Sequence, residues 1–79
     1  MNEQRRKAIS KIWDKLEELK QELEDLAQEE RDAYENLPES LQYSVRGEAM
    51  EEAADILEEQ ATAIQDVMDA LSDIRNPIM

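Results

Sequence analysis

Apolar residues recur every three or four positions along two long stretches of the chain, one on each side of Pro38. In the first stretch they are Ile9, Ile12, Leu16, Leu19, Leu23 and Leu26. In the second stretch, where only Gln60 interrupts the series, they are Met50, Ala53, Leu57, Ile64, Val67, Leu71 and Ile74. Such a seven-residue repeat is typical of a helix whose apolar stripe is covered by a partner helix. The pattern predicts an all-α protein with two long helices.

The segment 37–44 breaks the repeat and contains Pro38, which lacks a backbone N–H and restricts the residue before it. We therefore expect one helical-hairpin domain over residues 1–79, with a first helix at about 3–36, a turn at 37–44 and a second helix at about 45–76 that Pro77 ends. Within the turn, we expect a short helical turn begun by Asn36, with Pro38 in its first positions.

The two repeats also predict how the helices align. We place Ile9 and Met50 at position a of heptads lettered a to g. In an antiparallel hairpin, a and d positions then face each other when paired residue numbers share the sum 83, as in Leu19 with Ile64. The midpoint of this register falls at residues 41 and 42, inside the predicted turn. The hairpin should be about 45 Å long at about 1.5 Å per residue, and the alanines of the second helix predict a close approach of the helix axes.

The second helix is apolar at positions e and g as well as at a and d, and this face is too wide for one neighbour. We therefore expect a homo-oligomer, most simply a dimeric four-helix bundle. The expected interface residues are Trp13, Ala54, Ile56, Ala61, Ala63, Met68 and Ala70. Trp13 has an alternative role, as an exposed residue that recognises another protein.

Composition excludes several classes of chemistry. The chain has no cysteine and no histidine, which excludes disulfides, thiolate nucleophiles, zinc sites of the usual kind and imidazole acid/base catalysis. It has no run of roughly 20 apolar residues and no apolar secretory segment near the N-terminus. These features predict a soluble cytoplasmic protein without a membrane partner.

The charge is strongly negative and unevenly distributed. Nine basic and 21 acidic residues give a net charge of -12. Residues 1–20 carry six basic against four acidic residues, a local +2, whereas residues 21–79 carry three against seventeen, a local -14. Direct binding of nucleic acid is not expected, because it depends on Lys and Arg that neutralise phosphates. The acidic surface suits a basic partner protein or serves only solubility.

The turn end of the hairpin gathers the candidate ligand-binding residues Arg31, Tyr34, Tyr43, Arg46 and Gly47. Aromatic rings and guanidinium groups can stack on a base or grip a phosphate, but they can also pack a loop onto a bundle. Glycine in a helix costs roughly 1 kcal/mol relative to alanine, so Gly47 predicts the close approach of another backbone or of a ligand.

Glu30 and Gln60 are polar residues at seam positions. We expect them to specify register or oligomeric state, with Arg31 and Arg46 close enough to neutralise Glu30. The alternative places Glu30 in a ligand pocket near the turn.

Four carboxylates of the second helix lie one turn apart, at Glu48, Glu51, Glu52 and Asp55. Helical magnesium-dependent nucleotide pyrophosphohydrolases assemble their metal sites with this spacing. In the predicted register these groups face solvent, whereas a metal site needs converging ligands. We therefore predict no catalytic residue, no metal site and no cofactor, with such an enzyme as a remaining alternative.

From Glu30 onward the chain reads Glu-Arg-Asp-Ala-Tyr-Glu-Asn-Leu-Pro-Glu-Ser-Leu-Gln, followed after three residues by Arg-Gly-Glu-Ala-Met-Glu-Glu-Ala. This segment resembles small acidic helical-hairpin proteins of phages and prophages, which share the Asn-Leu-Pro-Glu-Ser-Leu-Gln turn. The resemblance implies a phage accessory protein of the host cytoplasm, a class in which many small helical members inhibit host defence by binding. An alternative is an oligomer that sequesters a nucleotide immune signal between its subunits.

Overall fold

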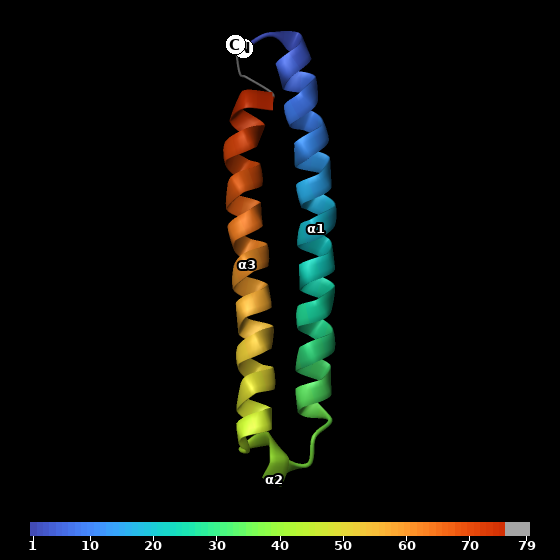
Figure 1. Ribbon diagram of the computed structural model, residues 1–79, viewed down its shortest axis with the longest axis vertical. Helices are drawn as coiled ribbons and strands as arrows, with labels where there is room; N and C mark the ends of the chain where they lie inside the picture. The colour runs from blue at the N-terminus through green and yellow to red at the C-terminus, as the bar shows by residue number, and fades with distance from the viewer. Residues whose placement is uncertain (76–79) are drawn as a thin grey trace.

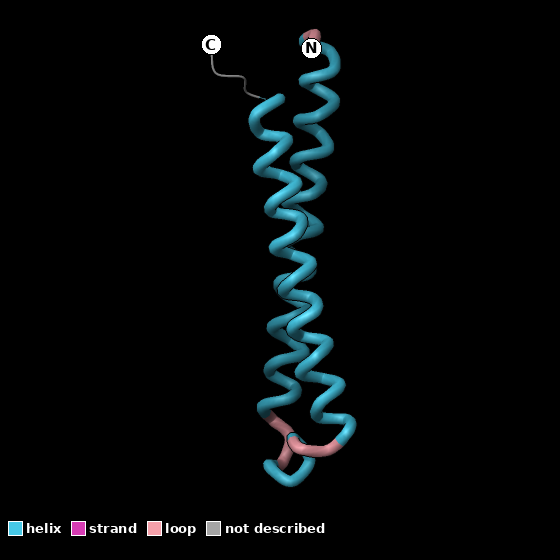
Figure 2. Tube along the Cα trace, turned by 90° about the vertical axis from the view of Figure 1, so that its left-hand side faces the viewer, coloured by secondary structure: helices cyan, strands magenta, loops and turns pink. Residues whose placement is uncertain are grey.

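The computed structural model describes residues 1–75, which form two long antiparallel helices joined by a turn that contains a one-turn helix (Figures 1 and 2). The helices are α1 (Glu3–Glu35), α2 (Glu39–Gln42) and α3 (Val45–Arg75). Both views show α1 and α3 side by side from the turn to the open end. The described part of the chain contains no strand, and the predicted all-α hairpin is confirmed. The expected end of the second helix at Asn76 and the role of Pro77 lie outside the described residues.

Polar side chains cap the ends of α1. The Asn2 side chain accepts a hydrogen bond from the backbone N–H of Arg5 at 2.8 Å, which satisfies one of the free donors of the first helical turn. At the other end, Nε2 of Gln42 donates to the carbonyl oxygens of Tyr34 at 3.3 Å and Leu37 at 3.2 Å. The carbonyl of Tyr34 also accepts the backbone N–H of Leu37 at 3.1 Å, so Gln42 adds a side-chain link between the turn and the end of α1.

The short helix of the turn begins later than the sequence predicts. Asn36 is still the C-cap of α1, because its N–H bonds to the carbonyl of Asp32 at 3.0 Å. Pro38 directly precedes α2, with a φ of -54° and a ψ of 144°. The helical turn therefore starts at Glu39 and not at Asn36, since extended backbone at Pro38 separates it from α1.

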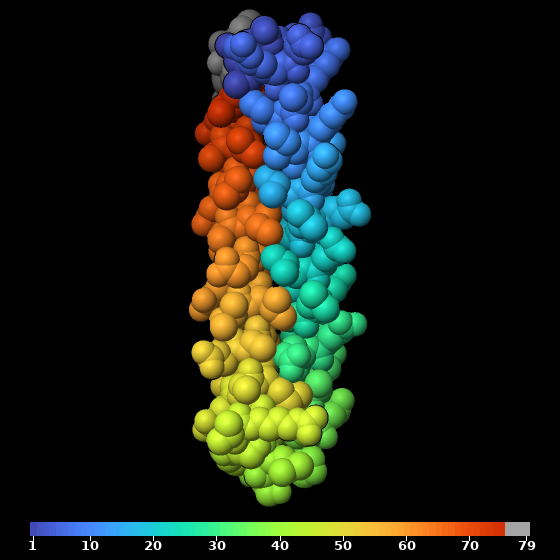
Figure 3. All heavy atoms as spheres, viewed as in Figure 1, coloured from blue at the N-terminus to red at the C-terminus, as the bar shows by residue number. Residues whose placement is uncertain are grey.

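The molecule is a rod with principal extents of 58 × 15 × 15 Å (Figure 3). Two hydrogen bonds define the axial alignment of the helices. The indole Nε1 of Trp13 donates to the carbonyl of Met68 at 3.0 Å, and Nζ of Lys20 donates to Oε1 of Gln65 at 2.7 Å. The numbers in these pairs sum to 81 and 85, either side of the predicted 83, so the axial register agrees with the prediction.

The face that each helix turns to the other differs from the prediction. Among residues 1–75, the buried residues are Ala27 of α1 and Gly47, Ala54, Ala61 and Met68 of α3, and all five lie at position e. The a positions are half-buried beside them, from Ile9 to Glu30 on α1 and from Met50 to Leu71 on α3. The hairpin is therefore closed by a and e positions, whereas the heptad repeat predicts a and d positions.

The physical reason lies in the size of the side chains at position e. Ala54 and Ala61 are small buried residues on α3, which lets the backbone of α1 approach closely. On α1 the same position holds Trp13 and Lys20, whose long side chains reach across to hydrogen-bond acceptors on α3. A second helix can cover only part of so wide an apolar face. The small residues of α3 and the long hydrogen-bonding side chains of α1 together favour coverage of the a and e side.

Candidate functional site

Within the described parts of α1 and α3, six large aliphatic side chains are left between 40% and 51% exposed. They are Ile12, Leu19 and Leu26 of α1 and Ile56, Val67 and Ile74 of α3. We call these six residues the apolar face. The exposed alanines Ala33, Ala49, Ala63 and Ala70 occupy the same helix positions, d on α1 and g on α3. Isolated exposed aliphatics are common, but a contiguous row of them marks an interaction site.

The apolar face lies on one side of the hairpin. Around each helix, position a lies between positions d and e. The exposed d column therefore lies on one side of the a column, and the buried e column lies on the other side. Because both helices are right-handed and run antiparallel, the same rotational order brings both d columns to one face of the rod. The g column of α3, which contains Ile56, adjoins this face and widens it.

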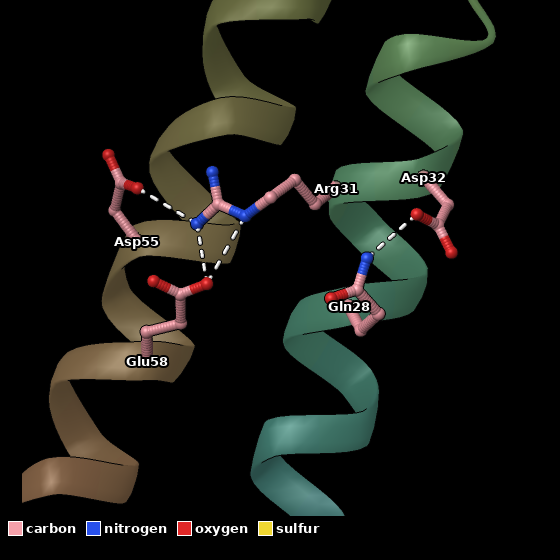
Figure 4. A network of polar contacts seen from close by, with 5 residues as sticks. All are labelled: Gln28, Arg31, Asp32, Asp55 and Glu58. Carbon is pink, nitrogen blue, oxygen red and sulfur yellow. Dashed lines mark hydrogen bonds and ion pairs between the residues drawn. The ribbon is translucent and has the colours of Figure 1, made fainter.

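The opposite side of the seam carries polar bridges. Nη2 of Arg31 lies 2.8 Å from Oε1 of Glu58 and 3.2 Å from Oδ1 of Asp55. Nε of Arg31 also donates to Oε1 of Glu58, at 3.2 Å. Figure 4 shows the guanidinium of α1 reaching across to both carboxylates of α3. The hydrogen bonds to Glu58 and then to Asp55 raise the pKa of Arg31. Arg31 is therefore engaged within the hairpin, and a phosphate would have to compete with two carboxylates for it.

The other candidate residues of the turn end have different surroundings. Tyr34 is half-buried, and desolvation, followed by the Glu51 carboxylate, raises the pKa of its phenol. Tyr43 is 76% exposed. Arg46 is exposed and forms no ion pair with any residue from 1 to 75. The turn thus presents one free ring and one free guanidinium, without the Arg31 group that the prediction placed beside them.

Glu30 is half-buried, and its expected neutralisation by Arg31 or Arg46 is not found among the ion pairs of residues 1–75. The guanidinium of Arg31 is held instead by Glu58 and Asp55 on the other side of the seam. Gln60, the other polar seam residue, is exposed.

Gly47 serves the turn itself. A Cβ atom added to it would lie 2.6 Å from the carbonyl oxygen of Leu41 and would also clash with the carbonyl of Gln42. Its backbone N–H donates to Oγ of Ser44 at 3.2 Å. The close approach that the sequence predicted at Gly47 is therefore that of the backbone of α2, which leaves no space for a ligand.

Sequence reasoning missed Gln42, whose amide ties the turn to the end of α1. The available signal was a side chain with two donors placed a few residues beyond a predicted helix end, where free carbonyl groups gather.

Trp13 binds the two helices together near the open end. Beside its hydrogen bond to Met68, its ring lies under the guanidinium of Arg75, whose Cζ is 4.2 Å from the ring centroid. Such cation–π contacts stabilise by about 0.5–1 kcal/mol at exposed sites. Trp13 is half-buried, and both its ring face and its N–H have partners within the hairpin.

Besides Trp13, the expected oligomer residues divide into two groups. Ala54, Ala61 and Met68 are 0%, 3% and 2% exposed inside the hairpin. α1 already covers these three side chains, so they are not available for the contact with a second chain that the sequence predicts. Ile56, Ala63 and Ala70 are exposed on or beside the apolar face.

The carboxylates Glu48, Glu51, Glu52 and Asp55 are exposed along α3. Among residues 1–75, no three acidic side chains converge as metal ligands would. Two shallow depressions lie beside acidic residues of α3. One, of about 380 Å³, is lined by Asp55, Glu58, Glu59 and Thr62, all on α3.

No protein-family model matches the chain, and the comparisons find no curated protein and no solved structure similar to it. No helix within residues 1–75 has the length and apolar character needed to cross a membrane.

Proposed function

We propose that the protein is a non-catalytic interaction protein that acts as a homo-oligomer, most simply a dimeric four-helix bundle. The observation that carries the proposal is the apolar face, which the hairpin leaves half-exposed over most of its length. A chain of 79 residues folded as two helices buries little apolar surface, so a single hairpin is only marginally stable. Association adds the interior that the single hairpin lacks.

The size of the apolar face supports this proposal. Full burial of one large aliphatic side chain gains roughly 1.5–3 kcal/mol, so twelve half-exposed side chains from two copies gain roughly 9–18 kcal/mol. The loss of translational and rotational freedom on association costs about 4–15 kcal/mol. A stable dimer is therefore feasible when two copies use the whole face.

Self-association is tested by light scattering during gel filtration of the wild type and two lysine variants. We expect the wild type at twice the 9.2 kDa of the chain. Val67→Lys places a charge on the apolar face and should give a monomer. Thr62→Lys adds the same charge to α3 outside the apolar face and should leave the dimer intact. A wild-type mass of one chain would contradict the proposal.

The acidic surface outside the apolar face suits a basic partner protein. Together with the resemblance of the turn segment to phage proteins, it supports a phage-type inhibitor that binds a host defence protein in the host cytoplasm. Charge complementarity would speed association and select the partner. Crosslinking in a bacterium that expresses the chain would supply candidates, each purified and titrated at low and high salt. Affinity that does not change with salt would contradict the electrostatic part.

No observation in the structure favours the two alternatives. The nucleotide-sequestering oligomer predicts extra mass in native mass spectrometry of untreated protein. The magnesium-dependent enzyme predicts turnover of nucleoside triphosphates that is lost when Glu51 and Glu52 are replaced by glutamine.

A further inference from the structure

We propose that the second copy covers the apolar face in antiparallel orientation, so that α1 packs on α1, α3 packs on α3, and the two Gln60 side chains meet near the two-fold axis. This inference rests on the self-association proposed above and adds its geometry. It also assigns a role to Gln60, the polar residue that interrupts the apolar repeat of α3.

Two-fold symmetry leaves two ways to press the apolar faces together. If the axis runs along the rods, the hairpins are parallel and each α1 lies over the α3 of the other copy. If the axis runs across the rods, the hairpins are antiparallel and each helix lies over its own counterpart. Closed dimers of identical chains use the same patch on both copies, so these are the arrangements to compare.

Charge distinguishes the two arrangements. The two halves of α1 differ, with +2 for residues 1–20 and -6 for residues 21–36, where seven acidic residues face one arginine. On α3 the charge is -5 for residues 45–60, with six acidic residues against one basic, and -2 for residues 61–75, with three against one. Parallel hairpins place the +2 half of α1 over the -2 half of α3, but they also place the -6 half over the -5 half, which is the strongest repulsion in either arrangement. Antiparallel hairpins place the +2 half over the -6 half and the -5 half over the -2 half, which favours the antiparallel dimer.

Gln60 gives a second and independent argument. The contacts of Trp13 with Met68 and of Lys20 with Gln65 place Gln60 level with residues 21–25 of α1, around Leu23. In parallel hairpins its amide would therefore be covered by leucines of the other copy, and a buried amide without a partner is costly. In antiparallel hairpins whose axis passes between residues 61 and 62, the two Gln60 residues are offset by three residues, about 4.5 Å along the rod. Their long side chains can bridge this offset, so the two amides can bond to each other across the axis. A single polar pair in an apolar seam specifies register.

The register of the dimer is the one in which the apolar faces of the two copies overlap over the greatest length. On α3 the overlap pairs Ala49 with Ile74, Ala53 with Ala70, Ile56 with Val67 and Gln60 with Ala63. On α1 it pairs Ile12 with Ala33 and Leu19 with Leu26. The midpoints lie between residues 61 and 62 on α3 and between 22 and 23 on α1. The hydrogen bonds within the hairpin place these midpoints level to within about one residue, so one axis can serve both contacts. A slip by one heptad would leave apolar residues uncovered at both ends.

Distances between spin labels test the orientation. The chain has no cysteine, so Lys11→Cys and Asp25→Cys each give a single labelling site. Both residues are exposed at position c of α1, away from the apolar face. In the antiparallel dimer, the axial separation of the two labels is about 35 Å at position 11 and about 8 Å at position 25, at 1.5 Å per residue. In the parallel dimer, the two positions would give nearly equal distances.

The outcomes separate this inference from the proposed function. A much longer distance at position 11 than at position 25 supports the antiparallel dimer. Equal distances in a dimer of confirmed mass would overturn the orientation and leave self-association standing. Absence of coupling at both positions, with a single-chain mass, would overturn both.

A Gln60 variant tests the assigned role. In labelled Lys11→Cys protein, Gln60→Leu removes the amide pair, and we expect a second, shorter distance to appear beside the long one. Gln60→Asn keeps an amide and should retain the single long distance. Unchanged distances in the leucine variant would contradict the role of Gln60 as the residue that specifies orientation.

Discussion

Gly47 shows at the scale of a single residue how a local helix preference is overruled by a neighbouring backbone. In an exposed helix, glycine is less favourable than alanine by roughly 1 kcal/mol. At this position, however, the carbonyl oxygens of Leu41 and Gln42 occupy the space that a methyl group would need. The turn therefore requires the residue that helix propensity disfavours.

We expect Gly47→Ala to destabilise the hairpin by about 1–3 kcal/mol, the usual cost of forcing extra atoms into a packed site. Urea denaturation followed by circular dichroism measures the change. Ala8→Gly is the control, because Ala8 is exposed on α1, far from the turn and outside the apolar face, and should lose only about 1 kcal/mol of helix propensity. A Gly47→Ala variant more stable than the wild type would show that the backbone of α2 does not crowd this position.

The phenol of Tyr34 provides a second residue-scale prediction. Desolvation, followed by the Glu51 carboxylate, raises its pKa above the usual value near 10. The unfolded chain then loses this proton first as pH rises, so the contribution of Tyr34 to stability is present below pH 10 and is lost as pH rises through the folded-state pKa.

The Tyr43→Phe variant leaves Tyr34 as the one tyrosine, and its phenolate absorbance can be titrated directly. We expect a midpoint above 10 in the folded protein and a return to about 10 in concentrated denaturant. Identical midpoints in the two states would contradict the desolvated setting of this ring.

At the scale of the element, the structure decides which face of each helix packs against the other helix. Both helices carry apolar residues at a, d and e, and α3 adds g. Periodicity therefore predicts two amphipathic helices correctly, but it cannot rank the a and d side against the a and e side. Side-chain size and cross-helix hydrogen bonds decide between them, through Ala54 and Ala61 on α3 and through Trp13 and Lys20 on α1.

Leucine substitutions on α3 test this assignment. Ala61 is 3% exposed against α1, so Ala61→Leu should cost about 1–3 kcal/mol of stability through overpacking. Thr62→Leu is the matched control, because Thr62 is exposed on the outer side of the same helix and should change stability by no more than about 0.5 kcal/mol. Equal effects of the two variants would argue against a seam made of a and e positions.

At the scale of the whole molecule, the rod combines an uncovered apolar face with a net charge of -12. The apolar face favours association, whereas the charge opposes it and keeps the protein in solution. Antiparallel packing relieves part of this conflict, because it brings the basic end of each α1 against the acidic end of the other.

Association predicts thermal stability that depends on concentration. If folding and dimerisation are coupled, the unfolding midpoint of the wild type should rise by several degrees over a hundredfold increase in protein concentration. Val67→Lys should lower the midpoint and remove the dependence, because it remains a single hairpin. Scanning calorimetry at the two concentrations measures both effects. A wild-type midpoint that is independent of concentration would argue against coupled association.

The sequence by itself determined the two long helices, the turn around Pro38 and the axial alignment of the helices, because heptad periodicity and the restrictions of proline act locally. It also determined the charge difference between the ends of α1. Only the tertiary structure decided which columns of the heptad meet, that Arg31 bonds to Glu58 and Asp55, and that Gly47 receives the backbone of α2. These outcomes depend on the size and reach of side chains from two distant segments, and neither segment specifies them alone.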